Sequence, residues 1–203
     1  MMRLHIGDKE VSTWSMRPWL LLKELGVPFE VEEHRFLDDV SLQRQQWRAF
    51  SPTSKVPVLE DGERVIWDSL AICLYLAEHF PGIWPQDPAA RAWSYSAVAE
   101  MHSGFTALRT QCPFPVRAEK REMTNTDLAK DVQRIDELWQ QGLAQFGGGF
   151  LAGDTFSVAD AFYAPVVLRL DFYGLIGAIS ASSQAYMARI CNLAGVKEWC
   201  ARN

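Results

Sequence analysis

Hydrophobic and polar positions along the first half of the chain predict alternating strands and helices. The short segment from Arg3 to Ile6 is typical of a strand. The apolar run from Trp19 to Leu25 predicts a helix, with Ser15 as its N-cap and Pro18 in its first turn, where a missing N–H costs nothing. Pro28 to Glu33 predicts a second strand, parallel to the first because a helix connects the two.

A proline inside an apolar run marks the stretch from Ser51 to Ser69. Pro57 cannot donate a hydrogen bond to a neighbouring strand. Two explanations remain: an edge strand, or a tight turn at a cis Val56–Pro57 bond. The pair Asp61–Gly62 then predicts a hairpin turn between two short strands.

Two helices are expected on either side of this stretch. Residues 38–50 are polar with weak helical spacing, so we expect a marginal, mobile helix there. Asp68 and Ser69 open a second helix that ends at His79. Its expected apolar stripe consists of Leu70, Cys73, Leu74 and Ala77.

The stretch from Ser51 to Ser69 also predicts a binding surface. A cis-proline turn leaves the backbone N–H and C=O of Val56 free to pair with an extended peptide. The helix N-terminus at Ser69 offers N–H groups to a carboxylate, and Asp68 is placed to hold an ammonium group. These groups suit a small zwitterionic peptide. The alternative is an ordinary edge hairpin followed by a capped helix.

The second half of the chain has an all-helical pattern. Residues 80–88 contain three prolines and a glycine and read as a linker. One long helix is expected through Trp93 and Leu108, ending near Cys112–Pro113. A second starts at Thr124 to Asp127 and ends at the glycine run 147–149. A third, very apolar and therefore central, begins at a capping box of Ser157 and Asp160, and two short helices close the chain at 183–193 and 196–201.

Composition narrows the class of protein. The chain has 203 residues, is 48% hydrophobic and carries a net charge of -5, so nothing attracts it to nucleic acid or to an anionic membrane. The N-terminus lacks the apolar core of a signal peptide, and a cytoplasmic location is expected. The cysteines form no C-x-x-C pair and the histidines are scattered, so we expect no metal: Cys73, Cys112, Cys191 and Cys200; His5, His34, His79 and His102.

Taken together, these features resemble the cytosolic glutathione S-transferases over nearly the whole chain. The resemblance rests on Lys55-Val56-Pro57-Val58-Leu59, Asp68–Ser69, the proline-rich linker and the box of Ser157 and Asp160. It is closest to bacterial members related to the zeta class, which have a serine-rich entry to the first helix, here residues 12–17. The implied fold is an α/β thioredoxin-like N-terminal domain (1–81), a linker (82–88) and an all-α C-terminal domain (89–203).

The resemblance also implies site residues. Glutathione is the co-substrate, and a hydroxyl group lowers the pKa of its thiol from roughly 8.5, the value for free cysteine. Ser12 is the expected catalytic hydroxyl, with Thr13 and Ser15 as alternatives. Val56, before a cis Pro57, resembles the residue that pairs its backbone with the cysteinyl unit. Asp68 and Ser69 resemble the pair that binds the γ-glutamyl end. Lys55 resembles a residue that contacts a glutathione carboxylate.

The second substrate, a small electrophile, is expected between the two halves. Candidate residues are Trp14, His102, Phe105, Arg109 and the segment Cys112-Pro113-Phe114-Pro115, with Arg109 placed to attract an anion. Trp14 stands where the zeta motif has cysteine, and Trp19 where it has a basic residue. These departures put the maleylacetoacetate isomerase activity of that class in doubt, and Trp14 argues against a catalytic cysteine.

Three functions remain open from the sequence. The leading one is glutathione conjugation to a small electrophile. The second is a glutathione-dependent isomerase, acting on a maleylacetoacetate-like substrate, or a dehalogenase. The third is a non-catalytic binding protein on the same fold. A homodimer is expected by resemblance.

Overall fold

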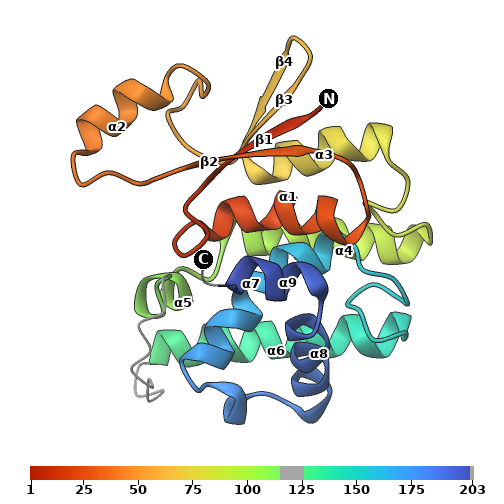
Figure 1. Cartoon of the computed structure of the whole chain (residues 1–203). Coiled ribbons are helices and arrows are strands. Elements are labelled where there is room, and N and C mark those ends of the chain that lie inside the picture. Colours follow the sequence, from red (N-terminus) through yellow and green to blue (C-terminus); the bar gives the residue numbers. More distant parts are fainter. Residues whose placement is uncertain (115–125, 202–203) are drawn as a thin grey trace.

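A four-stranded sheet organises the N-terminal half of the computed structural model, which describes residues 1–114 and 126–201 (Figure 1). The strand order is β2-β1-β3-β4. β1 and β2 are parallel, as predicted, and the other two pairings are antiparallel. The strands are β1 (Arg3–Gly7), β2 (Glu30–His34), β3 (Val58–Asp61) and β4 (Arg64–Trp67).

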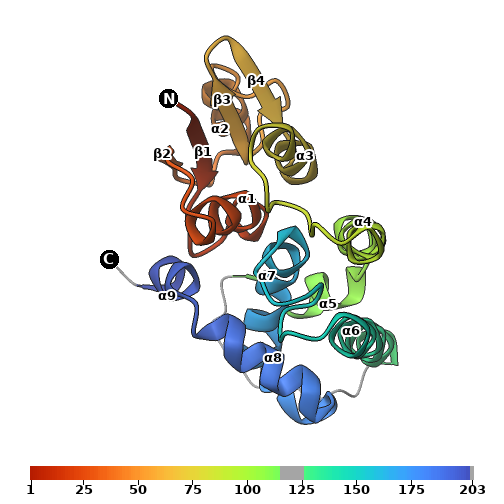
Figure 2. The ribbon, with the colours of Figure 1, turned by 90° about the vertical axis from the view of Figure 1, so that its right-hand side faces the viewer.

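Helices cover one face of the sheet, and helices with their connections make up the described part of the C-terminal half (Figure 2). The structure thus has a thioredoxin-like α/β domain followed by an all-α domain. None of the described helices is both long and apolar enough to cross a membrane. The helices are α1 (Thr13–Glu24), α2 (Val40–Trp47), α3 (Ser69–His79), α4 (Pro88–Ser103), α5 (Thr106–Gln111), α6 (Thr126–Phe146), α7 (Val158–Phe172), α8 (Ala181–Cys191) and α9 (Ala194–Cys200), with a short 3-10 turn η1 (Ile176–Ala178).

The alternation of side chains along β1 decides which face of the sheet is buried. Leu4 and Ile6 are fully buried, and they belong to the core that includes α1 and α3. Arg3 and His5 point to the opposite face, because successive side chains in a strand alternate. α1 lies between the sheet and α7, and its central residues are buried on all sides (Figure 1).

The start of α1 differs from the prediction. Ser12, not Ser15, is the N-cap, because the amide of Met16 already donates to the carbonyl of Ser12. Ser15 therefore lies inside the helix, and Pro18 lies beyond its first turn. Gly26 follows the helix with φ of +65°, a conformation that glycine adopts without strain.

The expected long helix through Trp93 and Leu108 is broken into α4 and α5. Gly104 ends α4, and Phe105 follows in the left-handed conformation with φ of +56°. A side chain at Gly104 would meet the carbonyl oxygen of Glu100 at 2.7 Å, so glycine is required there. The helical spacing survives the break because α5 still buries Leu108.

Two other expectations are modified. Leu74 was placed in the buried stripe of α3, but it is 48% exposed, and the buried positions are Ile72, Cys73 and Leu76. The predicted helix start at Thr124 lies outside the described residues.

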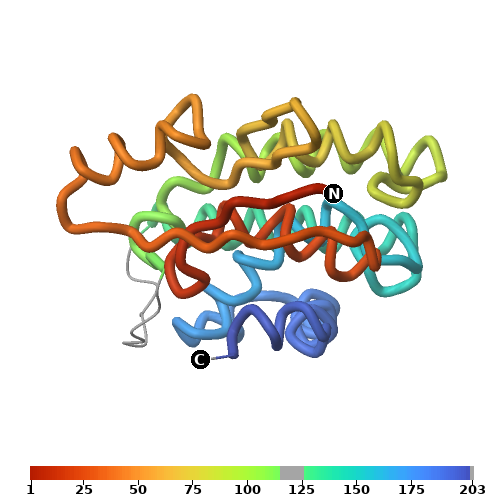
Figure 3. The backbone as a smooth tube through the Cα atoms, turned by 45° about the horizontal axis from the view of Figure 1, so that its top comes forward, coloured from red at the N-terminus to blue at the C-terminus, as the bar shows by residue number. Residues whose placement is uncertain are grey.

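The connection from α3 to α4 runs along one end of the molecule (Figure 3).

The central helix α7 is anchored by a buried carboxylate. Asp160 is fully buried and accepts hydrogen bonds from the backbone N–H of Leu151 at 3.0 Å and of Ser157 at 2.9 Å. Burial raises its pKa to about 6, and the hydrogen bonds oppose that rise. The predicted capping box is thus present, and it also fixes the loop that precedes α7.

We expect Asp160→Asn to lower the free energy of unfolding by about 1–3 kcal/mol, because an amide group supplies one fewer acceptor and leaves a buried donor unpaired. Urea unfolding measures this change. Asp154→Asn, at an exposed position in the preceding loop, is the matched control and should change stability by less than about 0.5 kcal/mol. Equal stability of wild type and Asp160→Asn would contradict the anchoring role.

Candidate active site

Two serine hydroxyls meet at the N-terminal end of α1. The Oγ atoms of Ser12 and Ser15 are 2.7 Å apart, and the backbone N–H of Gly7 donates to Ser15 Oγ at 3.2 Å. Ser15 is fully buried and Ser12 is 6% exposed. Either hydroxyl can donate in the Ser12–Ser15 contact. When Ser15 is the donor, the proton of Ser12 is free for a further acceptor.

The third hydroxyl of this segment belongs to Thr13 and faces a different neighbour. Arg169, on α7, donates from Nη2 to Thr13 Oγ1 at 3.3 Å. The hydroxyl proton of Thr13 is not used in that contact. The three hydroxyls considered from the sequence therefore occupy one turn of the chain. Thr13 keeps its proton, and one proton of the Ser12–Ser15 pair is left for a further acceptor.

The N-terminus of α3 lies across from α1. Asp68 is its N-cap, with φ of +76°, and accepts from the amide of Leu70 at 2.8 Å. Ser69 is buried, and its Oγ accepts from Nη1 of Arg17 at 3.3 Å. This contact joins the first helix to the start of the third. Asp68 also accepts from the amide of Ala71, so the N–H of Ser69 is the one left in the first turn of α3 for an anion.

The turn before β3 has the predicted shape. The Val56–Pro57 peptide bond is cis. Among the described residues, the backbone N–H and C=O of Val56 have no hydrogen-bond partner. Ser51 holds the turn: its Oγ donates to the carbonyl of Lys55 at 2.7 Å and accepts from the amide of Lys55 at 3.0 Å. The Lys55 residue itself is exposed.

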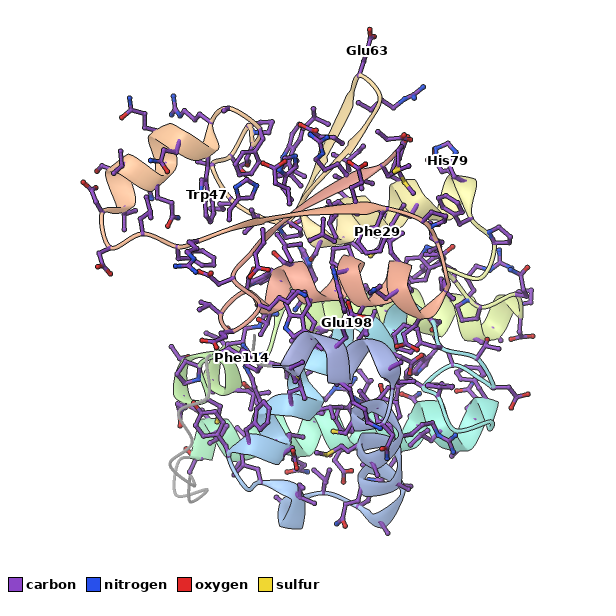
Figure 4. The ribbon with its side chains drawn as sticks, viewed as in Figure 1. Phe29, Trp47, Glu63, His79, Phe114 and Glu198 are labelled. Carbon is purple, nitrogen blue, oxygen red and sulfur yellow. The ribbon has the colours of Figure 1, made fainter. Side chains whose placement is uncertain are left out.

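A cavity of about 260 Å³ opens between the two halves of the molecule, beside the N-terminal end of α1. Phe114, one of its walls, lies below that end of α1 (Figure 4). Its lining includes two aromatic side chains, three guanidinium groups and one hydroxyl: Trp14 and Phe114; Arg17, Arg109 and Arg169; and Thr13.

The three arginines of this cavity are held without carboxylate partners among the described residues. Arg17 is 3% exposed and lies over the rings of Trp14 at 4.1 Å and Phe162 at 4.7 Å. Arg109 contacts the same Trp14 ring at 4.8 Å and donates to the carbonyl of Met101. These cation–π contacts and carbonyl bonds orient the charges without neutralising them.

Burial and the closeness of the three arginines lower the pKa values of their guanidinium groups. Burial lowers the pKa of Arg17 to about 9, and the nearby charges of Arg109 and Arg169 add to the effect. Burial likewise lowers the pKa of Arg169 to about 10. A bound anion would oppose both shifts, because an opposite charge favours the protonated guanidinium.

The expected acceptor-site residues divide into two groups. Trp14 and Arg109 line the cavity, as do Pro113 and Phe114. His102 lies just outside its lining, with Nε2 3.4 Å from Oδ2 of Asp68 and its ring edge-on to Trp14. The remaining candidates are placed differently: Phe105 is buried against Tyr163, Cys112 is fully buried, and Pro115 lies outside the described residues.

Sequence reasoning missed two features of the molecule. Arg169 was not singled out, although a lone arginine in the apolar run of α7 was a visible signal. His5, Glu32 and His34 form a second cluster on the outer face of the sheet, where no metal was expected. The parallel register of β1 and β2 brings them together, and scattered positions in the sequence gave no sign of it.

Comparison with known proteins identifies the family. The glutathione S-transferase N-terminal domain model matches residues 11–79, and the C-terminal domain model matches residues 96–202. Glutathione S-transferase 1 of Dianthus caryophyllus is 29% identical over 175 residues, covering 82% of this chain and 76% of the relative. Glutathione S-transferase Z2 of Arabidopsis thaliana is 30% identical over 129 residues, covering 60% and 56% of the two chains.

A solved structure shows the same fold. The glutathione transferase homolog from Burkholderia gl BGR1, a structure with bound glutathione, superposes with a TM-score of 0.70 at 22% identity. The match covers 98% of this chain and 95% of that one. Both domain models and the shared architecture lead to one conclusion: this chain belongs to the glutathione S-transferase family.

Proposed function

We propose that this protein is a serine-type glutathione transferase, related to the zeta class, that conjugates glutathione to a small anionic electrophile. One observation carries the proposal. Arg17 lines the arginine-rich cavity and at the same time donates to Ser69 at the N-terminus of α3. The proposed glutathione subsite and the acceptor cavity therefore share a residue, which places the two substrates side by side.

Glutathione is proposed to lie across three backbone features. Its cysteinyl unit pairs with the free N–H and C=O of Val56, before Pro57, as an added strand would. Its γ-glutamyl carboxylate binds the N–H and hydroxyl of Ser69, where the helix dipole favours an anion. Asp68 takes the ammonium group, and the exposed Lys55 contacts the other carboxylate.

Thiol activation is assigned to Ser12. The hydrogen bonds among Gly7, Ser15 and Ser12 support this role, because Ser12 keeps a proton for a thiolate when Ser15 donates in their 2.7 Å contact. The N-terminus of α1 and the nearby guanidinium groups favour the same negative charge. Lowering the thiol pKa by two requires about 2.7 kcal/mol of preferential thiolate binding. Thr13 and Ser15 remain the alternative donors.

We expect Ser12→Ala to raise the pKa of bound glutathione by about two, back toward roughly 8.5, and to slow conjugation at neutral pH by about tenfold to a hundredfold. The ultraviolet absorbance of the thiolate, followed against pH, measures the pKa. Thr13→Val and Ser15→Ala, at the two alternative donors, are the comparison variants. If Thr13→Val produces the shift and Ser12→Ala does not, Thr13 is the donor and the assignment to Ser12 is wrong.

The acceptor is proposed to be an anion with an apolar body. Trp14 and Phe114 offer aromatic surface, and Arg109 and Arg169 offer positive charge without a carboxylate partner among the described residues. An uncharged electrophile gains nothing from those guanidinium groups. An anionic one gains a charge-assisted interaction in a half-enclosed site.

We expect Arg109→Met to reduce kcat/KM for an anionic electrophile by about tenfold, which corresponds to about 1.4 kcal/mol, and to leave a neutral electrophile within about twofold. Arg109→Lys keeps the charge and should retain most of the preference. Steady-state kinetics with a carboxylated and an uncharged aryl halide provide the comparison. Equal losses with both substrates would show that Arg109 is structural and would remove the basis for an anionic acceptor.

Isomerisation of an anionic substrate is the second candidate function, favoured by the same arginines. Product analysis separates the two: conjugation consumes glutathione and leaves a thioether, whereas isomerisation returns glutathione unchanged. A dehalogenase would release halide. A non-catalytic role would show glutathione binding with no turnover of any of these substrates.

We also propose a cytoplasmic homodimer with a role in detoxification. Leu74 on α3 and Trp67 on the neighbouring strand β4 are exposed hydrophobic side chains, which supports a surface that a second subunit would cover.

We expect Leu74→Glu to shift the protein from dimer to monomer in light scattering, with Glu78→Gln on the same helix as control. A monomeric wild type at micromolar concentration would contradict the dimer.

A further inference from the structure

We propose that His5, Glu32 and His34 form a binding site for a divalent transition-metal ion. Nδ1 of His5 and Nε2 of His34 are 2.9 Å apart. The two oxygens of the Glu32 carboxylate face different histidines: Oε2 lies 3.8 Å from Nδ1 of His5, and Oε1 lies 3.8 Å from Nε2 of His34. All three ligand atoms lie within 4.8 Å of one another, on the face of the sheet turned away from the α1 and α3 core.

Strand register explains why the three side chains converge. In the parallel pairing of β1 with β2, His5 lies opposite Glu32 and Gly7 lies opposite His34. Glu32 and His34 are two residues apart, so they share a face of the strand. The backbone therefore fixes the spacing of the cluster.

The spacing suits a tetrahedral ion. Zinc binds imidazole nitrogen and carboxylate oxygen at about 2.0–2.2 Å, which separates neighbouring ligand atoms by roughly 3.3 Å. The observed distances of 2.9 Å and 3.8 Å lie on either side of that value, and all separations are within 4.8 Å. Shifts of about one ångström in the side chains, with rotation of the rings, bring the three ligands to one centre and leave a fourth position open.

An aromatic shell holds the two imidazoles. The ring of Phe50 stacks on His5 at 4.5 Å and on His34 at 4.1 Å, nearly parallel to both. Trp47, the last residue of α2, packs against His34 with ring centroids 6.1 Å apart (Figure 4). His5 is 3% exposed, whereas the side chain of Glu32 is 48% exposed. The histidines are thus pre-positioned, and the carboxylate side provides the entry path.

The far nitrogen of His5 supplies an independent indication. His5 Nε2 is buried and has no hydrogen bond, yet it lies 3.4 Å from Oε1 of Glu60 on β3. A histidine that ligates metal through one nitrogen usually directs its other N–H to a carboxylate. Metal at Nδ1 fixes the proton on Nε2, toward Glu60. Nη1 of Arg3 lies 3.8 Å from the carboxylate of Glu32 and 3.9 Å from that of Glu60. Because the Arg3 side chain is half exposed, it is free to move away from Glu32 when a metal ion binds there.

Two imidazoles and one carboxylate are ligands that suit Zn²⁺, Co²⁺ and Ni²⁺ rather than Mg²⁺ or Ca²⁺. The competing explanation is a pair of histidines that share one proton through their 2.9 Å contact and bind nothing. The cluster lies outside the arginine-lined cavity, so the proposal does not depend on the glutathione chemistry.

Titration of the tag-free, metal-stripped full chain with Co²⁺, in the absence of glutathione, tests the site. We expect one ion per chain, with the visible absorption of four-coordinate Co²⁺, and displacement by Zn²⁺. Glu32→Gln and His34→Gln should each weaken binding by about tenfold or more. His79→Gln changes an exposed histidine at the far end of α3 and should bind as wild type does (Figure 4).

Circular dichroism of each metal-free variant checks that it is folded. Because Glu32 is half exposed, Glu32→Gln remains informative even where His34→Gln unfolds. No Co²⁺ absorption in wild type, or equal binding by wild type and Glu32→Gln, would overturn the proposal and favour the proton-sharing histidine pair.

Discussion

A buried guanidinium at the junction of the two halves is the constraint on which the site depends. Arg17 contacts Ser69 of α3 on one side and the ring of Phe162 of α7 on the other. Taking such a charge out of water is costly unless an anion compensates. Its Nε has no partner in the described structure, and Arg109 and Arg169 lie close by. The fold therefore maintains a positive field at this junction, which the charges of Asp68 and Asp131 offset in part.

That field connects the architecture to the proposed chemistry. α1 is enclosed between the sheet and α7, so its N-terminal end has a fixed direction. The hydroxyls of Ser12 and Thr13, the helix dipole and the guanidinium groups then favour negative charge in the same small region. Under the proposed function, such a region would stabilise a thiolate and attract an anionic acceptor. Binding and activation would then be consequences of one electrostatic arrangement.

Local patterns predicted the fold well, and long-range contacts limited the prediction of the site. Strand–helix–strand order followed from periodicity. The proline left an edge strand or a cis turn open, and the family resemblance favoured the cis bond that the structure has. The N-cap was misplaced because Ser12 and Ser15 are equally suited hydroxyls, and only the Ser12 carbonyl bond to Met16 decides between them. The break at Gly104 was missed because apolar spacing continues across it. Arg169 reaches Thr13 across 156 positions, a contact that no local pattern reveals.

The central claim is that the site stabilises negative charge at the sulfur position of bound glutathione. Calorimetric titration of the full chain with glutathione sulfonate, an anion at that position, and with S-methylglutathione, which is neutral there, tests it directly. We expect the sulfonate to bind about tenfold more tightly, and Arg17→Met to abolish the preference. Equal or tighter binding of S-methylglutathione to wild type would contradict the account.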